Sequence, residues 1–599
     1  MGKRFQHRLD ILALLSVAIL VGLVFRLCYL QIWKGEDFSR LADGNRIRLI
    51  PVAAPRGLMF DRNGEQLVTN RAGFSVFILP FKGPVDPDTI SRLGSILNIP
   101  EEEIQTKIRQ NGGRVDPILI KNDLTPEMIA RIEERRSDLP GVVVEAQPIR
   151  YYTNNEIGAQ VLGYVSEINE ENLKARTAKG LDYRAGDLIG KAGLEQYYDM
   201  ELRGTRGGSQ VEVDVSGRPV AVLGKQNPIA GQNLKLTIDL QLQKAAESAV
   251  DNHLASLRSQ GNTTQAVAVV AMDPRNGQIL AMVSKPSYNP NLFATGISQK
   301  EWDKLAGNPF DPMTNKAISG EYPPGSPFKV VMALAALETG KVTPGETFFD
   351  GGDHPLARGK GNAGGAALGW INLRRAIQRS DNVFFYEMGY RLGIDTIGQY
   401  ARMFGMGERT DIDLPGETDG LVASREFKKK AYGTDDWYIV ETMDAAIGQG
   451  FQLTTPIQMA QIISVIANGG IRYRPYVVEQ MTDSDGNITR DIKPHILGQV
   501  QFKPENLAFV REAMNSTTQG DGGAVGILGD FPYRMGAKTG TAENPHGQDH
   551  SWFVAYGPQE DPQIVVVVLV EQGGYGAVAA GPIARAVLDQ YFHLNEPKK

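Results

Sequence analysis

The chain has 599 residues, which is too long for one compact domain and predicts two to four folding units. Its formal net charge of -6 provides no basic face, so no nucleic-acid partner is expected. Cys28 is the single cysteine, which excludes an internal disulfide and a cysteine-based metal cluster. With 42% hydrophobic and 22% charged residues, the composition is ordinary for folded protein.

A membrane anchor is the first predicted element. Residues 1–10 form a basic head that contains KRFQHR, and residues 11–31 form an apolar segment whose only charge is Arg26. About 20 helical residues span a bilayer core of roughly 30 Å, and Arg26 lies where its side chain can snorkel toward headgroups. No small-x-small cleavage site follows, so the segment is expected to remain attached.

The orientation of this anchor follows from its flanks. The basic head predicts that the N-terminus lies inside, and Tyr29 and Trp33 suit the aromatic belt at the opposite interface. We therefore expect a single-pass protein of the cytoplasmic (inner) membrane whose domains after the anchor are extracytoplasmic.

Residues 32–230 are predicted to form an elongated domain of mixed strands and helices, which we call the pedestal. The stretches EEEIQTKIRQ at 101–110 and PEMIARIEERR at 126–136 are typical of solvated amphipathic helices. The polar segment Gln226–Asn233, with one proline and one glycine, is predicted to be a linker.

Residues 231–597 are predicted to form an α+β domain. Residues 234–254 begin as a strand and continue as a helix, and two strands flank the hairpin signal Asn276-Gly277. Near the end come three more strands and a last helix, at 535–543, 551–558, 564–571 and 582–592. This order predicts one antiparallel five-stranded sheet, flanked by helices and assembled from both ends of the domain. The Gly/Ala-rich stretch 359–369 is expected to be a loop.

The first chemical motif is Ser326-Pro327-Phe328-Lys329, which follows a Pro-Pro-Gly turn. Pro327 suits the first position of a helix and Ser326 the cap before it, with Gly340 as the terminating residue. Ser326 would then lie at a helix N-terminus, where the dipole favours developing negative charge, with Lys329 one turn away. Taken alone, a Ser-x-x-Lys pair occurs by chance in most long proteins, and this pair is better interpreted as a capping serine and a surface lysine.

Two further motifs favour a catalytic role for Ser326 and Lys329. Ser380-Asp381-Asn382 lies 54 residues after Ser326, and Lys538-Thr539-Gly540 lies 212 residues after it. The three motifs in this order are typical of penicillin-binding proteins and class A β-lactamases. They predict an acyl-transfer site in which a buried lysine activates a serine.

Each residue of the site has an expected role. We expect Ser326 to attack a carbonyl carbon, Lys329 to accept its proton, Ser380 to relay a proton, and Asn382 to bind the substrate amide and Lys329. Lys538 would lower the pKa of Lys329 and attract a terminal carboxylate.

The strand that carries the third motif is expected to bind substrate. Thr539 and Thr541 would bond the carboxylate, and Gly540 would leave room for substrate at the strand edge. The backbone N–H groups of Ser326 and Thr541 would form the oxyanion hole. Asp381 is expected to be structural and to point away from the site. His546 and His550 form no catalytic pattern and are expected to be structural.

With these motifs the chain resembles the class B penicillin-binding proteins, and it is most similar to their elongation type. Departures from the family pattern are Pro327 after the nucleophile, where threonine is common, and Asp411, where glycine is frequent. The stretches that carry the resemblance are PRGLMFDRNG, GKAGLEQYYDMELRGTRG, FGMGERTDIDLPGE, IGQGFQLTTPIQMA, KTGTAE and HSWFVAYGP.

The resemblance implies a serine-type D-Ala-D-Ala transpeptidase that acts on lipid II or nascent peptidoglycan stem peptides and is acylated by β-lactams. It also implies a SEDS-family (RodA-like) glycosyltransferase in the membrane and an elongation-complex scaffold protein as partners. No cofactor is expected. Some relatives carry zinc, but Asp350, Asp353 and His354 lack the cysteine of such a site, so no metal is predicted.

Several alternatives remain at this point. A septal class B transpeptidase has the same chemistry and a different partner. A pedestal that activates a SEDS glycosyltransferase, with catalysis secondary, would be a scaffold. A β-lactamase would need no pedestal, a penicillin-sensing receptor would need several spans, and a bifunctional enzyme would need a glycosyltransferase domain before the pedestal.

Overall fold

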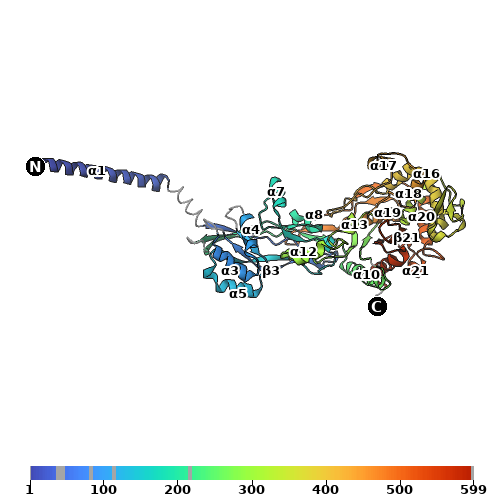
Figure 1. The fold of residues 1–599 in the computed structure, drawn as a ribbon, viewed down its shortest axis with the longest axis horizontal. Coiled ribbons are helices and arrows are strands. Elements are labelled where there is room, and N and C mark those ends of the chain that lie inside the picture. Colours follow the sequence, from blue (N-terminus) through green and yellow to red (C-terminus); the bar gives the residue numbers. More distant parts are fainter. Residues whose placement is uncertain are drawn as a thin grey trace.

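A computed structural model describes residues 2–34, 47–79, 85–110, 117–213, 219–262 and 264–594. Helix α1 (Gly2–Cys28) continues into the π-helical turn η1 (Tyr29–Trp33) and stands apart from the rest of the molecule (Figure 1). The stretch Leu12–Trp33 has a mean hydropathy of 2.3 and is exposed, as a single-pass membrane anchor requires. The helix also includes the expected head, because it begins at Gly2.

The pedestal is built on two long antiparallel strands, β3 (Gln66–Ile78) and β5 (Val142–Tyr152). Three helices pack on one end of this ribbon and enclose a separate apolar core: α3 (Pro87–Leu97), α4 (Glu101–Gln110) and α5 (Pro126–Glu134). The caps Asp86 and Thr125 each precede a proline at the first helical position, which explains where α3 and α5 begin. Both amphipathic helices predicted for the pedestal are thus confirmed.

The remaining pedestal elements are short. They are β1 (Ile47–Val52), β2 (Met59–Phe60), β4 (Ile118–Lys121), η2 (Arg136–Asp138), α6 (Ala159–Leu162), β6 (Val165–Glu167), α7 (Glu170–Ala178), β7 (Leu188–Gly190), α8 (Gly193–Tyr197), α9 (Asp199–Leu202), β8 (Gly207–Val213) and β9 (Pro219–Gln226).

A continuous sheet joins the pedestal to the C-terminal domain. Strand β10 (Asn233–Leu236) pairs in parallel with β2 of the pedestal and antiparallel with β18 (Val478–Thr482) of the C-terminal domain. The predicted linker before β10 is hydrogen-bonded to the pedestal, since Ile229 forms an antiparallel β-bridge with Thr205. The two domains are therefore held together by a hydrogen-bonded sheet and not by a free spacer.

The central sheet of the C-terminal domain has the strand order β12-β11-β23-β22-β21, with every neighbouring pair antiparallel. These strands span Ile279–Lys285, Val267–Met272, Ile564–Val570, His550–Gly557 and Gly536–Ala542 in that order. The predicted five-stranded sheet from both chain ends is confirmed. Strands β11 and β23 are apolar throughout because both faces of the sheet are covered by separate cores.

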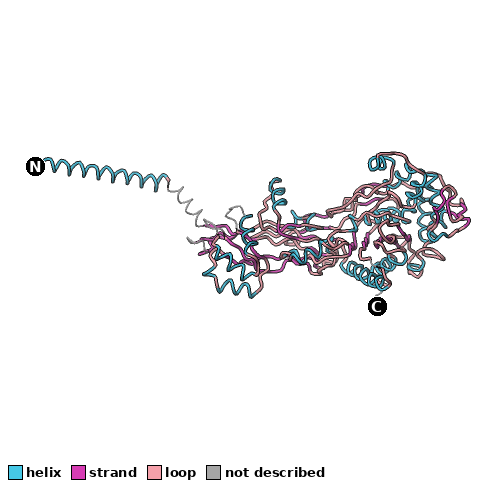
Figure 2. The backbone as a smooth tube through the Cα atoms, in the orientation of Figure 1, coloured by secondary structure: helices cyan, strands magenta, loops and turns pink. Residues whose placement is uncertain are grey.

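Helices lie on both faces of this sheet (Figures 1 and 2). Helices α10 (Leu240–Ser259) and α23 (Gly581–Tyr591) cover one face, and α19 (Pro456–Asn468) lies against the other. The helical middle of the domain follows the same side as α19 and contains α14 (Lys329–Glu338), α15 (Leu373–Arg379), α16 (Asn382–Met403), α18 (Ile439–Ala446) and α20 (Pro504–Ser516).

The other elements of this domain are short or peripheral. They are α11 (Asn291–Ala294), α12 (Gln299–Ala306), α13 (Lys316–Ser319), η3 (Ser326–Phe328), β13 (Thr347–Asp350), β14 (Asp353–His354), β15 (Ala357–Gly361), η4 (Ala363–Gly365), β16 (Gly369–Asn372), α17 (Arg425–Tyr432), β17 (Ile471–Tyr473), β19 (Ile488–Asp491), β20 (Ile496–Gln499), α21 (Val525–Leu528) and α22 (Gly576–Ala579). The expected loop at 359–369 in fact contains the end of β15, η4 and the first residue of β16.

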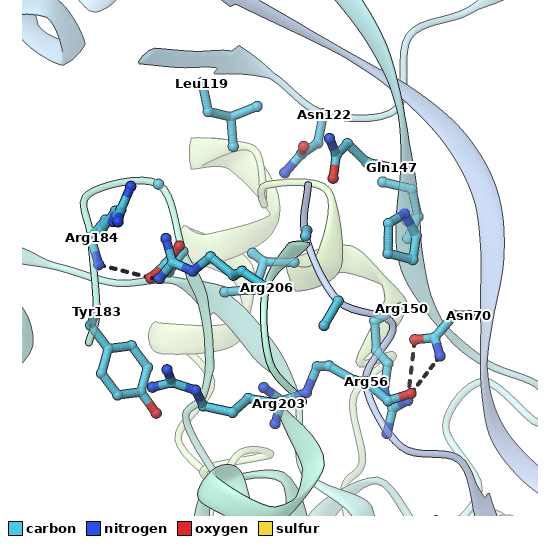
Figure 3. Close-up of a pocket in the computed structure, with 18 of the residues that line it drawn as sticks. Arg56, Asn70, Leu119, Asn122, Gln147, Arg150, Tyr183, Arg184, Arg203 and Arg206 are labelled. Atoms are coloured by element: carbon cyan, nitrogen blue, oxygen red, sulfur yellow. Dashed lines mark hydrogen bonds and ion pairs between the residues drawn. The ribbon is translucent and has the colours of Figure 1, made fainter. Parts of the chain in front are cut away.

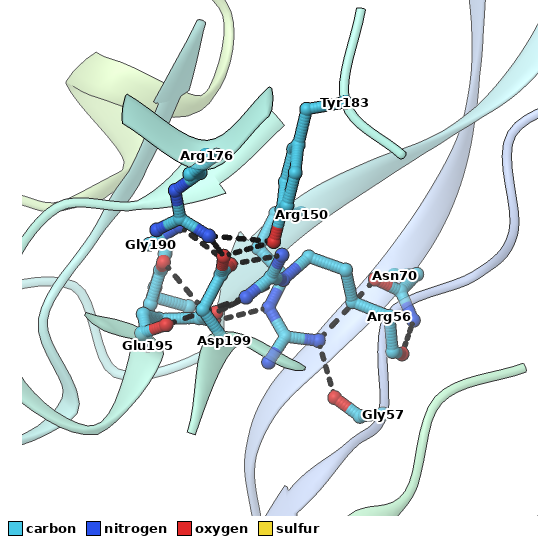
Figure 4. Close-up of polar contacts among 10 residues, drawn as sticks. Arg56, Gly57, Asn70, Arg150, Arg176, Tyr183, Gly190, Glu195 and Asp199 are labelled. Atoms are coloured by element: carbon cyan, nitrogen blue, oxygen red, sulfur yellow. Dashed lines mark hydrogen bonds and ion pairs between the residues drawn. The ribbon is translucent and has the colours of Figure 1, made fainter. Parts of the chain in front are cut away.

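The pedestal contains a cavity beside β5, lined on one side by arginine side chains (Figure 3). Behind it lies a buried ionic network (Figure 4). Glu195 is fully buried and accepts from Arg56 Nε at 3.0 Å and from Arg150 Nε at 2.6 Å. Asp199 accepts from Arg56 Nη1 at 3.0 Å and also pairs with Arg176. The network ties the start of the pedestal to β5 and to α8–α9.

Replacing Glu195 tests how much the pedestal depends on this network. Glu195→Gln removes the negative charge that the buried guanidinium groups of Arg56 and Arg150 share. We therefore expect the free energy of unfolding to fall by about 3 kcal/mol. The measurement is urea unfolding of the full chain in detergent, followed by circular dichroism. The control is Glu170→Gln, which removes an exposed pair with Lys174 and is expected to leave the unfolding free energy almost unchanged. Equal losses in the two variants would contradict the expectation.

Candidate active site

The turn at Ser326 differs from the prediction in its capping residue. Gly325, at φ +57°, is the cap, and Ser326 is the first residue of the 3₁₀ turn η3, so the α-helix begins only at Lys329. The prediction of Ser326 as the cap was wrong because the left-handed glycine already reverses the chain. Gly340, at φ +67°, follows the end of α14 as predicted.

Close backbone contacts hold this turn in place. Gly325 N–H donates to the Gly448 carbonyl oxygen at 2.8 Å, and a Cβ on Gly448 would lie 2.4 Å from the Gly325 oxygen. On the other side, Trp552 Nε1 donates to the Pro323 carbonyl oxygen at 2.9 Å. Ser326 itself is partly exposed, whereas the residues on either side of it are buried.

Gly540 has a packing role that was not predicted. A Cβ at this position would lie 2.5 Å from Pro327 Cδ and 2.9 Å from Trp552 Cβ. The missing side chain therefore lets η3 pack directly on strand β21. Thr539 and Thr541 are partly exposed on the same strand, while Lys538 is buried.

Lys329 is completely buried and held by the second motif. Its Nζ donates to Asn382 Oδ1 at 2.5 Å and to the Ser380 carbonyl oxygen at 2.8 Å. Burial lowers the pKa of Lys329 to about 7, against the opposing effect of the Asp381 charge. Within the described part of the chain, the Ser326 hydroxyl makes no hydrogen bond to Lys329. In enzymes without substrate, catalytic contacts of this kind are often still long.

The side chains of Lys538 and Lys329 both approach the hydroxyl group of Ser380. Lys538 Nζ donates to Ser380 Oγ at 2.7 Å, and the same oxygen lies 3.5 Å from Lys329 Nζ. Burial and the neighbouring Lys329 charge lower the pKa of Lys538 well below its ordinary value. Ser380 can adopt this position because it is the left-handed cap of α15, at φ +58°. The structure thus brings Lys329, Ser380, Asn382 and Lys538 together.

The second motif is itself supported by residues that sequence reasoning missed. Asn382 N–H donates to Asn362 Oδ1 at 2.6 Å, and Asn382 Nδ2 donates to the Gly361 carbonyl oxygen at 3.1 Å. Asn362 also donates to Asp350 Oδ2 at 2.7 Å. No motif marked Asn362, because its importance arises only when β15 folds against the start of α16.

Asp381 is structural, as expected, but it is electrostatically coupled to the site. It accepts from Phe384 N–H at 2.6 Å and so caps α16. Burial and the neighbouring Asp350 raise the pKa of Asp381 to about 6. Its carboxylate nevertheless favours the protonated form of Lys329.

The residues considered for metal binding have other partners. His354 Nε2 lies 3.1 Å from Glu387 Oε2, and Asp350 accepts from Gly352 N–H at 2.7 Å. No group of three or more potential metal ligands occurs within the described ranges. His550 is half-buried and packs edge-on against Tyr322 behind the Ser326 turn.

Comparison with known protein families agrees with this geometry. Residues 267–589 match the model of the penicillin-binding protein transpeptidase domain, and residues 51–236 match that of the penicillin-binding protein dimerisation domain. The peptidoglycan D,D-transpeptidase MrdA of Escherichia coli K12 is 34% identical over 97% of this chain and 93% of its own. MrdA of Acinetobacter baumannii is also 34% identical, over 98% and 87%.

Solved structures give the same result. Penicillin-binding protein PBP2 of Pseudomonas aeruginosa has a TM-score of 0.68 and 32% identity over 91% of this chain and 96% of that chain. PBP2 of Helicobacter pylori, in complex with MreC, has a TM-score of 0.78 and 26% identity over 91% and 99%. A chain of a peptidoglycan synthase complex has a TM-score of 0.72 and 31% identity over 99% of both chains.

The chain therefore belongs to the class B penicillin-binding proteins. It is a serine-type peptidoglycan D,D-transpeptidase of the elongation type, and none of these comparisons favours the septal alternative.

The lowered pKa of Lys329 predicts the pH dependence of acylation. A general base must be neutral, so the rate of acylation by a penicillin should rise with pH through about 7 and level off above it. Asp381→Asn keeps a capping side chain and removes the charge that raises the pKa of Lys329, so the midpoint should shift to lower pH. Stopped-flow acylation rates across pH 5–9 measure both midpoints. An unchanged or higher midpoint in Asp381→Asn would contradict this coupling.

Gly540→Ala tests the packing of η3 on β21. The added methyl would overlap Pro327 and Trp552, so we expect the Ser326 turn to shift and acylation to slow by at least tenfold. Gly526→Ala, where a Cβ meets nothing within 4 Å, is the control and should acylate normally. Normal acylation of Gly540→Ala would show that the contact is unimportant.

Proposed function

We propose that Ser326 is the nucleophile and Lys329 the general base of this transpeptidase. The support is the burial of Lys329 and its lowered pKa, one turn after Ser326. Ser380 would relay a proton between Lys329 and the leaving amine, since its hydroxyl lies between the two lysines. Asn382 would orient Lys329 and bind the substrate amide.

Lys538, Thr539 and Thr541 would bind the terminal carboxylate of the donor peptide. Lys538 supplies positive charge, and the two threonines are partly exposed on the edge strand β21, with Gly540 between them. The backbone N–H groups of Ser326 and Thr541 would stabilise the oxyanion of the tetrahedral intermediate.

The reaction proceeds in two acyl transfers. Ser326 Oγ attacks the carbonyl carbon of the penultimate D-Ala of a stem peptide, its proton passes to Lys329, and terminal D-Ala leaves as the protonated amine. An amine of a neighbouring stem peptide then attacks the ester, loses a proton and restores Ser326. A β-lactam would acylate Ser326 in the same way, but its amine remains attached and deacylation is slow.

The chain would act outside the membrane with its N-terminus inside, residues 32–230 as pedestal and residues 231–597 as transpeptidase domain. Residues 595–597 of that range lie outside the described structure. A RodA-like SEDS glycosyltransferase and an MreC-type scaffold are the proposed partners. A PBP2–MreC complex and a peptidoglycan synthase complex among the similar structures support them.

Labelling with a fluorescent penicillin tests the nucleophile. The full chain in detergent is incubated beside Ser326→Ala and beside Ser259→Ala, an exposed serine at the end of α10. We expect covalent label on a denaturing gel that lasts for hours in the wild type and Ser259→Ala and is absent from Ser326→Ala.

Three other outcomes would contradict the proposal. Label that is shed within seconds would indicate a β-lactamase. Label that persists in Ser326→Ala, or is absent from all three folded proteins, would exclude Ser326 as the nucleophile. The absence of label from all three would leave a scaffold that activates the glycosyltransferase as the better interpretation.

A further inference from the structure

The arginine-lined cavity of the pedestal lies far from the serine site along the chain. It has a volume of about 170 Å³ and lies between β5, the loop before β7 and the turn after α9 (Figure 3). One wall is apolar and includes Phe77, Leu119 and Ile149. The other wall carries five arginines, which are Arg56, Arg150, Arg184, Arg203 and Arg206, and one carboxylate, Asp187.

Cationic side chains outnumber carboxylates among the residues that line this cavity, with five arginines beside the single carboxylate of Asp187. Asp187 pairs with Arg206, and Arg184 lies 3.8 Å from the exposed carboxylate of Asp182.

Two guanidinium groups of the wall also have buried N–H donors without an acceptor. Arg150 is 1% exposed, and its Nη2 has no hydrogen-bond partner within the described structure. The same holds for Nη1 of Arg203, whose Nη2 donates to the Asp182 carbonyl oxygen at 2.8 Å and whose guanidinium stacks on Tyr183. An unpaired buried donor on a charged group is costly, so an acceptor is expected at this position.

We propose that this cavity binds an anion that carries a phosphate or diphosphate group. A phosphate dianion suits a wall rich in arginine, because planar guanidinium groups bind its oxygens in a bidentate manner. Arg150 and Arg203, the two arginines with an unpaired buried donor, both line this wall. The apolar wall then covers the uncharged remainder of a larger ligand.

Such an anion would connect parts of the pedestal that are distant in sequence. Arg150 belongs to β5, whereas Arg203 follows α9. In α8–α9, Asp199 is adjacent to Tyr198, whose hydroxyl donates to Asp413 Oδ2 of the C-terminal domain at 2.9 Å. Occupancy of the cavity would therefore stiffen the end of the pedestal that contacts the transpeptidase domain.

The test is a titration of the full chain in detergent with inorganic pyrophosphate, at ionic strength matched with chloride. We expect the melting temperature to rise by about 2 °C at saturation, and calorimetry to give a binding constant. Geranyl diphosphate, as a second probe, distinguishes the source of the ligand. Binding at least tenfold tighter than pyrophosphate would indicate a lipid-linked diphosphate, and equal binding a free phosphate.

Variants of Arg203 test whether pyrophosphate binds in this cavity. Arg203→Gln should bind pyrophosphate at least tenfold more weakly, and Arg203→Lys, which keeps the charge without the planar fork, should also weaken it. Arg92→Gln is the matched control because Arg92 also donates to a backbone carbonyl in the pedestal, away from the cavity. Penicillin labelling reports that each variant is folded.

No binding by the wild type, or equal binding by Arg203→Gln, Arg203→Lys and Arg92→Gln, would overturn the proposal. If Arg203→Gln does not fold, the comparison of Arg203→Lys with Arg92→Gln decides the question.

Discussion

The active site depends on two lysine side chains that are buried side by side. Lys329 and Lys538 are almost inaccessible to solvent, and Ser380 Oγ lies between their ammonium groups. No carboxylate contacts either group directly in the part of the chain that the structure describes. Burial and the repulsion between the two ammonium groups therefore disfavour charging both amines, and the proposed role of Lys329 as the base requires that Lys329 be the neutral one.

This arrangement is possible only where three segments meet. Strand β21 brings Lys538, the η3–α14 turn brings Ser326 and Lys329, and the junction of α15 and α16 brings Ser380 and Asn382. Close approach of these segments depends on small residues. Gly540 lets the turn lie on the strand, and Gly448 lets the Gly325 backbone approach from the other side.

The pedestal also contains buried cations, but these have a structural role. Arg56 and Arg150 are as inaccessible as the active-site lysines, but carboxylates of Glu195 and Asp199 contact them directly. A guanidinium group stays charged in proteins, and paired in this way the two groups hold distant segments together. A lysine amine, in contrast, can lose its proton when it is buried without a contacting carboxylate.

The sequence by itself determined the apolar anchor, two of the pedestal helices, the five strands of the sheet and the identity of the clustered motif residues. Each of these depends on periodicity, turn residues or spacing, which are local properties of the chain. Only the tertiary structure decided that Gly325 caps the Ser326 turn, that Gly540 packs against Pro327, and that Asn362 supports Asn382. The Gly325 backbone is held by a hydrogen bond to Gly448, and the other two features are contacts between separate segments. Local sequence carries no record of which of these segments will meet.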